Sequence, residues 1–426
     1  MSWPSGSTAS SPASSWVAPT TRSSWWWCSG RSSATGELVL KRGGDRRLRA
    51  GHPWIYRGEI ADIRGAWVPG DAVAVLDSTG RLLGRGLYNP RTGIACRLLT
   101  RRDELVDAEL IHRRLAGALQ FRQTAGLAGE GYRLCWSEAD GLPGLVVDRY
   151  GPVSVVQCQT LGMSRLGGWV AGALGRLFPD GSIYRGDDAT AARIEGFEPQ
   201  RGWLTSAPSA AEEMEITDGP CRLVVTPGGG HKTGLYLDQR ANHALVAGYA
   251  SGRRVLDAFA YQGAFACHAL LGGASRAVLI ESSTGALATA RRNLEANGVA
   301  ERAELREANA FDELRQLEAG RERFGVVVLD PPPFTRRKEA VDAATRGYKE
   351  INIRGLRLLE PGGVLATFSC SHHVTPELFE TICRDAAGDA GVTTRILAPL
   401  TQARDHPVLL NVPETRYLTG LLLQAV

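Results

Sequence analysis

The chain has 426 residues, of which 43% are hydrophobic, and it carries a formal net charge of +4. This length allows two or three domains with sizeable cores. The sequence contains no apolar stretch of about eighteen residues, which a membrane span needs, and its start lacks the basic segment and apolar core of a secretory signal. We therefore expect a cytoplasmic protein without a membrane partner.

Residues 1–36 differ in composition from the rest of the chain. They are rich in Ser, Thr and Pro and include the run Trp25-Trp26-Trp27-Cys28, with neither helical nor strand periodicity. We expect this segment to be disordered and assign it no function. A start codon placed too far upstream is an alternative explanation for its composition.

Residues 37–103 contain short apolar segments at 38–40, 72–76 and 94–99, separated by turn residues, which predicts a small β-barrel. Between residues 37 and 102, thirteen Lys and Arg stand against six Asp and Glu, on a body that is otherwise mildly acidic. Such a basic module favours a polyanionic partner such as nucleic acid. A merely solvated surface explains the charge equally well.

Residues 104–222 mix helical and strand patterns. We expect a helix from 103 to about 124, strands at 145–148 and 153–157 that pair across a Gly-Pro turn, and a helix at 167–177. This segment therefore predicts a small α/β central domain.

From residue 223 to the C-terminus, short apolar strands alternate with helices. Strands are expected at 255–256, 277–280, 326–329 and 364–368. Wholly apolar strands between helices are typical of a parallel sheet that is covered on both faces. The predicted class is α/β, with a Rossmann-like, mostly parallel sheet preceded by the central domain and the N-terminal β-barrel.

The turn after the first of these strands contains Asp257, Phe259, Tyr261 and Gly263 and leads into a helix. Ligands of open α/β sheets lie beyond the carboxyl ends of the strands, where glycine permits close approach of the backbone. The turn is not GxGxxG, so a dinucleotide phosphate fits it poorly. We predict that these four residues border a nucleoside cofactor.

Two further strand ends complete this predicted pocket. Glu281, followed by Ser282, lies about twenty residues beyond the glycine turn, the spacing at which an acid accepts both hydroxyls of a ribose. An exposed acid at a strand end is the alternative. Asn309 follows the third strand, and its carbonyl oxygen can accept a hydrogen bond from an adenine amino group. Asp312 is the expected N-cap of the next helix.

Asp330 and Cys370 follow the next two predicted strands. Asp330 opens a loop stiffened by three successive prolines, and Cys370 lies between two serines, ahead of His372 and His373. Because the carboxyl ends of neighbouring parallel strands meet at one edge of a sheet, we expect both residues beside one pocket. The two histidines either contact the substrate or belong only to the loop.

A cysteine at this position suits the methylation of cytosine. Cytosine C5 is a weak nucleophile, but addition of a thiolate to C6 makes C5 enamine-like, so that it can attack a sulfonium methyl group. Asp330 would hold the N3/N4 edge of the base and favour protonation at N3. The alternative for Cys370 is a small buried hydrophobic residue. The eight cysteines form no CxxC pair and no histidine group has metal-ligand spacing, so we expect neither disulfides nor a metal.

Five motifs are specific when taken together. They are Gly51-His52-Pro53-Trp54-Ile55-Tyr56, Gly84-Arg85-Gly86-Leu87-Tyr88-Asn89-Pro90, Glu138-Ala139-Asp140-Gly141-Leu142-Pro143-Gly144-Leu145-Val146-Val147-Asp148, Lys232-Thr233-Gly234-Leu235-Tyr236-Leu237-Asp238-Gln239-Arg240 and Ser369-Cys370-Ser371. From about Leu38 to its end, the chain resembles the bacterial 23S ribosomal RNA cytosine-5 methyltransferases. That family combines a PUA domain, a central domain and a class I methyltransferase domain.

This resemblance implies an enzyme that uses S-adenosylmethionine to form 5-methylcytosine in large-subunit ribosomal RNA. In the family a Gln-Arg pair lies beside the cofactor, so Gln239 and Arg240 are expected to bind it. The implied partner is ribosomal RNA, and a homodimer is left open. The family usually has Lys, Asp, Thr and Arg where this chain has Pro333, Asn309, Gln262 and His243.

Two alternatives stay open. The first is a related RNA methyltransferase that modifies a guanine nitrogen, which needs no cysteine. The second is a protein that only holds RNA, against which the set Asp257, Glu281, Asp330 and Cys370 argues. In either case we expect the basic module of residues 37–103 to grip the RNA backbone through Arg42, Arg46, Arg47 and Arg49, near His52 and Trp54.

Overall fold

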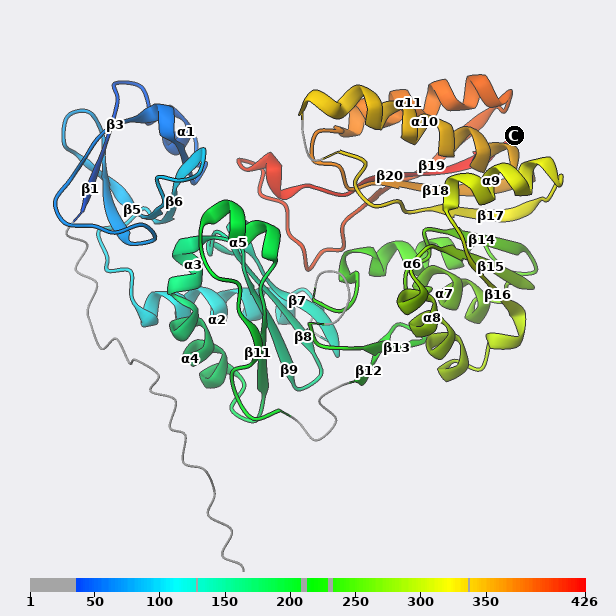
Figure 1. Cartoon of the computed structure of the whole chain (residues 1–426), viewed down its shortest axis with the longest axis horizontal. Helices are drawn as coiled ribbons and strands as arrows, with labels where there is room; N and C mark the ends of the chain where they lie inside the picture. Colours follow the sequence, from blue (N-terminus) through cyan, green and yellow to red (C-terminus); the bar gives the residue numbers. More distant parts are fainter. Residues whose placement is uncertain (1–35, 128, 208–212, 229–232, 336–337) are drawn as a thin grey trace, which may run out of the picture. The chain divides into compact units, whose positions relative to one another are not determined.

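The computed structural model describes residues 36–127, 129–207, 213–228, 233–335 and 338–426 (Figure 1). The segment predicted to be disordered lies outside these ranges except for its last residue, as does Lys232 of the motif that ends in Arg240. No helix among the described residues is long and apolar enough to cross a membrane.

The first described domain is a six-stranded sheet in the order β2-β6-β5-β4-β1-β3. Its strands are β1 (Glu37–Leu40), β2 (Trp54–Tyr56), β3 (Ile60–Arg64), β4 (Ala72–Leu76), β5 (Leu82–Tyr88) and β6 (Ile94–Thr100), with a short helix α1 (Arg46–Arg49). Alternate strand residues, among them Leu38, Leu40, Val73 and Val75, form its core. At Gly84 a Cβ would stand 2.1 Å from the Thr100 carbonyl oxygen, so glycine is required for β5 to approach β6.

The central domain has a five-stranded sheet in the order β11-β10-β9-β8-β7. Its elements are α2 (Ala108–Thr124), β7 (Gly131–Trp136), β8 (Leu145–Tyr150), β9 (Val153–Cys158), α3 (Leu161–Arg165), α4 (Gly167–Leu177), β10 (Ser182–Gly186), α5 (Ala189–Glu195) and β11 (Arg201–Trp203). The antiparallel pairing of β8 with β9 and the helix α4 confirm the sequence predictions. Helix α2 begins later than predicted because the Asp107 side chain caps it by accepting from Leu110 N at 2.8 Å.

A hairpin of β12 (Met214–Asp218) and β13 (Cys221–Val225) precedes the C-terminal domain. That domain has a seven-stranded sheet in the order β16-β15-β14-β17-β18-β20-β19, in which the first five strands are parallel. The strands are β14 (Arg254–Ala258), β15 (Arg276–Glu281), β16 (Ala303–Glu307), β17 (Phe324–Leu329), β18 (Leu359–Ser369), β19 (Thr394–Thr401) and β20 (Thr419–Ala425). The predicted doubly wound parallel sheet is confirmed, with an antiparallel edge added by β20 and β19.

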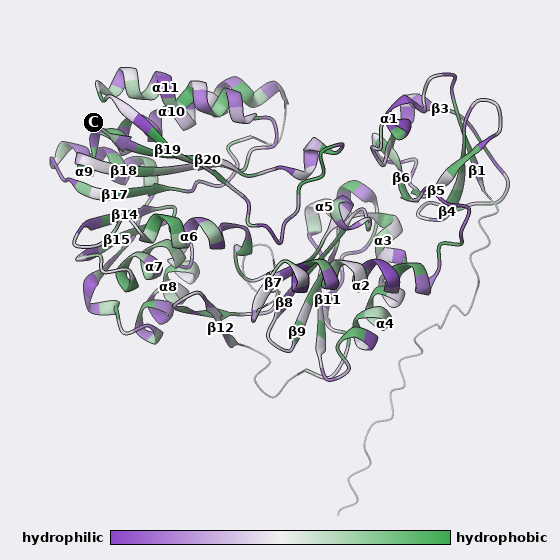
Figure 2. Ribbon diagram, turned by 180° about the vertical axis from the view of Figure 1, so that it is seen from behind, coloured by the Kyte–Doolittle hydropathy of each residue, from purple (hydrophilic) through white to green (hydrophobic). Residues whose placement is uncertain are grey.

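Six helices cover the two faces of this sheet. They are α6 (Arg240–Ala247), α7 (Ala264–Leu271), α8 (Thr284–Ala296), α9 (Ala310–Ala319), α10 (Val341–Arg357) and α11 (Pro376–Ala390). Neighbouring residues of one strand enter opposite cores: Val326 and Val328 join the core beneath α6–α8, whereas Val327 joins that of α9–α11. Figure 2 shows the hydrophobic colour running along these strands, while the helices carry both colours. This packing fixes the carboxyl ends of the parallel strands at one edge.

Candidate functional site

Three acidic side chains meet at the carboxyl ends of β14, β15 and β17. Asp257 lies in β14 and Glu281 ends β15, while Asp330 directly follows β17, and β14 pairs in parallel with both neighbours. Asp257 is 1% exposed. Burial, together with the negative charges of Asp330 and Glu281, raises the pKa of Asp257 to about 8, although a hydrogen bond from Ala266 N opposes this shift. Asp257 is therefore largely protonated at neutral pH.

The turn after β14 is held in an uncommon backbone conformation. Phe259, Tyr261 and Gly263 have φ angles of +64°, +48° and +72°. Left-handed conformations cost free energy at non-glycine residues and persist where surrounding contacts fix them, often at ligand sites. Here Tyr261 N donates to Glu281 Oε2 at 3.0 Å. A Cβ at Gly263 would stand 2.8 Å from Leu279 Cδ2, so the turn lies tightly against β15.

The Glu281 carboxylate is oriented before any ligand binds. Its Oε1 accepts from Ser283 N at 2.8 Å and from the Ser282 hydroxyl at 3.3 Å, while Oε2 accepts from Tyr261 N. A carboxylate has about four lone-pair positions, so these three bonds leave one position, on Oε2, for a ribose hydroxyl. The position of Glu281 therefore fits the predicted ribose contact, which stays a prediction.

Asn309, rather than Asp312, caps helix α9. The Asn309 Oδ1 accepts from Phe311 N at 2.9 Å, and Asp312 lies inside the first turn and pairs with Arg315 at 2.9 Å. The prediction of Asp312 as N-cap was wrong, because Asn is an equally good cap and stands three residues earlier. The cap uses one of the two lone pairs of the Asn309 oxygen, so the adenine contact stays a prediction.

An aromatic group that the sequence analysis missed lies next to this strand end. The Phe311 ring lies 6.2 Å from that of Phe259 and 5.5 Å from that of Phe334, which in turn lies 4.4 Å from Tyr348. These residues come from separate segments, so no sequence spacing announces them. They supply an apolar wall beside the acidic strand ends, as a pocket for a flat base requires.

Gln239 holds the carboxylate of Asp330. Its Nε2 donates to Asp330 Oδ2 at 2.9 Å, and its own Oε1 accepts from Asn242 Nδ2 at 2.6 Å. Asn242 also donates to the Thr401 carbonyl at 3.0 Å. Both amides are buried. Gln239 was predicted to contact the cofactor, and this contact stays a prediction. In the structure Gln239 is hydrogen-bonded to Asp330, and Asn242 fixes the orientation of its amide.

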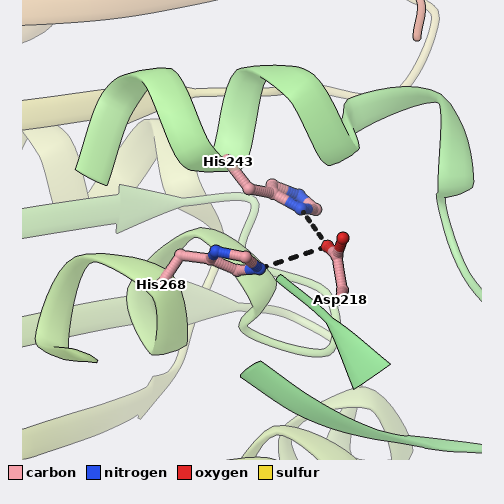
Figure 3. A group of neighbouring side chains, drawn as sticks. All are labelled: Asp218, His243 and His268. Atoms are coloured by element: carbon pink, nitrogen blue, oxygen red, sulfur yellow. Dashed lines mark hydrogen bonds and ion pairs between the residues drawn. The ribbon is translucent and has the colours of Figure 1, made fainter. Parts of the chain in front are cut away.

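Arg240 points to a different part of the domain. Its Nε donates to Asp218 Oδ1 at 2.9 Å, and its guanidinium also bonds the Gly131 carbonyl. Asp218 Oδ2 accepts from His243 Nδ1 and from His268 Nε2, each at 3.1 Å (Figure 3). Arg240 therefore ties β12 and the central domain to helix α6, and its predicted cofactor contact stays a prediction.

Asp218, His243 and His268 form the one group of three ligand types close enough to hold a metal ion among the described residues. Burial opposes ionisation of Asp218, yet its hydrogen bonds from both histidines hold its pKa well below the ordinary value. Burial lowers the pKa of His243, so that ring is neutral at pH 7. The charge of Asp218 is already balanced by Arg240, whose guanidinium would repel a divalent cation. The group is best described as a hydrogen-bonded anchor.

Cys370 directly follows β18 and faces the loop that follows β17. Its Sγ lies 3.7 Å from the carbonyl oxygen of Pro331, the residue after Asp330. The next residue, Ser371, is buried, and its hydroxyl lies 2.9 Å from the Tyr348 hydroxyl, which anchors the loop. As expected for neighbouring parallel strands, Asp330 and Cys370 come to one edge of the sheet.

The other described cysteines are all buried, whereas Cys370 is partly exposed. Burial raises the pKa of Cys96, Cys158 and Cys383 to about 12. These thiols cannot reach a substrate and do not ionise at neutral pH. Access alone therefore singles out Cys370 as a nucleophile among the described cysteines. His372 is exposed and His373 is half-buried in the same loop, and Pro333 is exposed in the loop after Asp330.

The predicted RNA-binding residues of the first domain fall into two groups. Arg42 and Arg46 are exposed. The others contact neighbouring acids: Arg47 lies 3.8 Å from Glu414, Arg49 bonds Asp45 and Asp77, His52 lies 3.0 Å from Glu414, and the Trp54 indole donates to Glu138 at 2.8 Å. His52 and Trp54 thus connect the first domain to later segments, in addition to any role with RNA.

Comparisons with known proteins agree with this architecture. Residues 38–101 match a PUA-like domain, and residues 195–401 match an S-adenosylmethionine-dependent methyltransferase domain. The chain is 39% identical over 389 residues to ribosomal RNA large subunit methyltransferase I of Klebsiella pneumoniae (strain 342), covering 90% of this chain and 96% of that protein. It is 37% identical to the protein of the same name from Alteromonas mediterranea, covering 92% and 99%.

Among solved structures, a methyltransferase described as complexed with SAH has a TM-score of 0.79 at 18% identity, covering 91% of this chain and 99% of that one. A SAM-dependent methyltransferase from Streptococcus mutans gives a TM-score of 0.78 at 17% identity, with the same coverage. At such low identity these likenesses concern the fold.

Proposed function

Because the chain belongs to the ribosomal RNA large subunit methyltransferase I family, we propose that it transfers a methyl group from S-adenosylmethionine to C5 of a cytosine in large-subunit ribosomal RNA. The cofactor and the methyltransferase class follow from the domain match, and the substrate is inferred from the relatives' names. The choice of cytosine C5 as the methylated atom depends on one observation.

That observation is the position of Cys370. It is the one partly exposed thiol among the described cysteines, it follows a parallel strand, and it lies beside the loop that begins with Asp330. Methylation of a guanine nitrogen needs no such thiol. A cysteine kept only for packing would be enclosed, as Cys383 is at 3% exposure.

In the proposed mechanism the Cys370 thiolate adds to C6 of the cytosine and forms an S–C6 bond. The electrons of the C5–C6 double bond shift toward N3, which takes up a proton from solvent, and the Asp330 carboxylate accepts hydrogen bonds from the N3/N4 edge while this happens. As C5 gains the methyl group, N3 releases that proton again. Loss of the C5 proton to water then restores the C5–C6 double bond, breaks the S–C6 bond and releases the thiolate.

The remaining residues of the site position the reactants. Gln239, locked by Asn242, keeps the Asp330 carboxylate in one orientation. The acids Asp257 and Glu281 suit the hydroxyls and the positive charge of S-adenosylmethionine. The buried Asp257 Oδ1 has no hydrogen-bond partner among the described residues, so it could accept a hydrogen bond from a ligand. When bound, the cofactor supplies an electrophilic methyl group.

The test combines activity with covalent trapping. Cys370→Ala and Cys370→Ser should abolish methyl transfer to large-subunit ribosomal RNA while calorimetry shows unchanged S-adenosylmethionine affinity. RNA containing 5-fluorocytosine should form a covalent adduct with the wild-type protein, since fluorine replaces the proton that must leave. Mass spectrometry should locate the adduct at Cys370.

Cys383→Ala is the matched control, because this thiol is on the buried face of α11 and should not affect catalysis. Full activity of Cys370→Ala without an adduct would reject covalent cytosine chemistry. An adduct at another cysteine would support the covalent mechanism but would show that Cys370 is not the nucleophile.

A further inference from the structure

A cavity of about 620 Å³ opens next to the nucleophile loop. Ser371 and His372, which directly follow Cys370, form one side of it, and the start of α11 forms another. The remaining wall is the segment between β19 and β20, from residue 408 to residue 419. A cavity of this volume is in the range that binds small organic molecules of nucleotide size.

The wall formed by the 408–419 segment carries exposed apolar side chains. Leu410 is fully exposed at 100%, and Val408 is 40% exposed. A leucine side chain in water loses the stabilisation that burial of its apolar surface would provide. Isolated exposed apolar residues are common on protein surfaces. What distinguishes Leu410 is the rigidity of the turn that presents it.

Hydrogen bonds fix both sides of this turn. Leu409 N donates to the Thr415 hydroxyl at 2.9 Å, and Val412 N donates to the Leu409 carbonyl at 3.1 Å. At its base the buried Gln402 side chain donates to the carbonyls of His406 and Thr415, at 2.8 and 2.9 Å. Leu410 therefore sits at the apex of a preorganised turn, so that contact with a ligand costs little conformational entropy.

The same segment connects the nucleophile loop with the basic first domain. Asn411 Nδ2 donates to the Gly51 carbonyl at 2.6 Å, and Glu414 pairs with His52 at 3.0 Å and with Arg47 at 3.8 Å. These pairings offset the charge of Glu414, and the exposed Arg416 and the exposed Glu377, which have opposite charges, both line the cavity. The cavity thus has an apolar wall and a rim of nearly balanced charge, and its 408–419 wall contacts the predicted RNA-binding module.

We propose that this cavity is a subsite for a nucleotide adjoining the target cytosine in the RNA, with Leu410 packing against its unstacked base. The inference rests on the proposed function, since it assumes an RNA substrate. Enzymes that act on a base must take it out of the stack, and apolar side chains commonly occupy the space that unstacking opens. An RNA base presents a flat apolar face to Leu410, and its phosphate can pair with Arg416.

The test uses Leu410→Ala, which cannot disturb folding through lost packing because the side chain is fully exposed. We expect about a 10-fold loss of kcat/KM on transcribed large-subunit ribosomal RNA, with unchanged S-adenosylmethionine affinity and melting temperature. Ile396→Ala, which removes a 53% exposed side chain from β19, is the matched control and should change nothing. A photoreactive phenylalanine analogue at position 410 should crosslink within one or two nucleotides of the methylated cytosine.

Wild-type activity of Leu410→Ala, or a crosslink to a distant RNA site, to a second copy of the chain or to no RNA, would overturn the subsite. These outcomes leave the proposed function intact if the wild-type protein still methylates the RNA through Cys370. If the wild-type protein does not methylate ribosomal RNA, the proposed function fails first and the inference fails with it.

Discussion

Replacing Asp257 by Asn should stabilise the cofactor-free protein and weaken cofactor binding. Asp257 is fully enclosed, and its pKa is raised to about 8 by burial and by the charges of Asp330 and Glu281. In the unfolded chain the same carboxyl group ionises near 3.8. Folding at neutral pH must therefore protonate it, and this costs free energy.

The magnitude follows from the shift in pKa. One pKa unit corresponds to about 1.4 kcal/mol, so the free-energy cost at pH 7 is about 4 kcal/mol. Because the pKa of Asp257 is higher in the folded than in the unfolded protein, this carboxyl group lowers the stability of the fold as the pH rises. The loss of stability is absent below pH 4, grows as the pH rises toward 8 and is constant above pH 8. Asn keeps an acceptor for Ala266 N but buries an amide without a full set of partners. We therefore expect a net gain of about 2–3 kcal/mol at pH 7.

The assay is thermal or urea unfolding of both proteins between pH 4 and pH 9. The melting temperature of Asp257→Asn should exceed that of the wild type by roughly 5–10 °C at pH 8. Near pH 4 it should fall slightly below that of the wild type, because only the cost of the buried amide then remains. Calorimetry should show S-adenosylmethionine binding about 10-fold weaker in the variant, without the wild-type rise in affinity between pH 6 and pH 8. Asp312→Asn, an exposed acid on α9, is the control. Equal stability of Asp257→Asn and wild type at every pH would refute the reasoning.

Three further predictions follow from the same contacts. Glu281→Ala should weaken S-adenosylmethionine binding by about 2–4 kcal/mol in calorimetry, since the ribose acceptor and the anchor of Tyr261 N are both lost; unchanged affinity would remove Glu281 from the site. Neutralising the exposed Arg42 and Arg46 should reduce the salt dependence of RNA binding by about one unit of slope per phosphate contact, whereas Arg384→Gln on α11 should not. Adding Zn²⁺ or a chelator should leave the melting temperature unchanged, because Arg240 already balances Asp218; a rise with Zn²⁺ that His243→Ala abolishes would show a metal site instead.

The parts of the fold that the sequence predicted are those set by local patterns. The apolar segments 326–329 and 364–368, which lie between helical segments, indicate a parallel sheet. In such a sheet the carboxyl ends of the strands lie at the same edge, whatever the conformation of the loops. Asp330 and Cys370 could therefore be placed beside one another from their positions alone. The antiparallel edge formed by β19 and β20 was not predicted. In β19 the apolar residues are interrupted by Arg395 and Pro399, and the apolar run Leu421-Leu422-Leu423 of β20 does not by itself show an antiparallel direction.

The directions of individual side chains could not be predicted in the same way. Gln239 and Arg240 are adjacent in the chain, yet one reaches Asp330 and the other reaches Asp218. A change of one residue at the start of a helix turns a side chain by about 100°, so the partner of each side chain depends on where the start of α6 lies relative to Asp218 of β12 and to Asp330 after β17. Asp218, His243 and His268 belong to three separate elements, and no spacing in the sequence predicts that they lie together.

The acidic strand ends also suggest why a methyl transfer site is built at a cost in stability. The negative charges of Asp330 and Glu281 help to raise the pKa of Asp257 in the cofactor-free protein, and a positively charged ligand would relieve that repulsion. If S-adenosylmethionine binds at these three acids, as we propose, its sulfonium charge provides this relief. Transfer of the methyl group removes that charge, so the three acids would then hold the product less tightly than the substrate. On this proposal, the stability lost at Asp257 is linked to turnover, because the electrostatic preference for the charged cofactor would favour release of the neutral product.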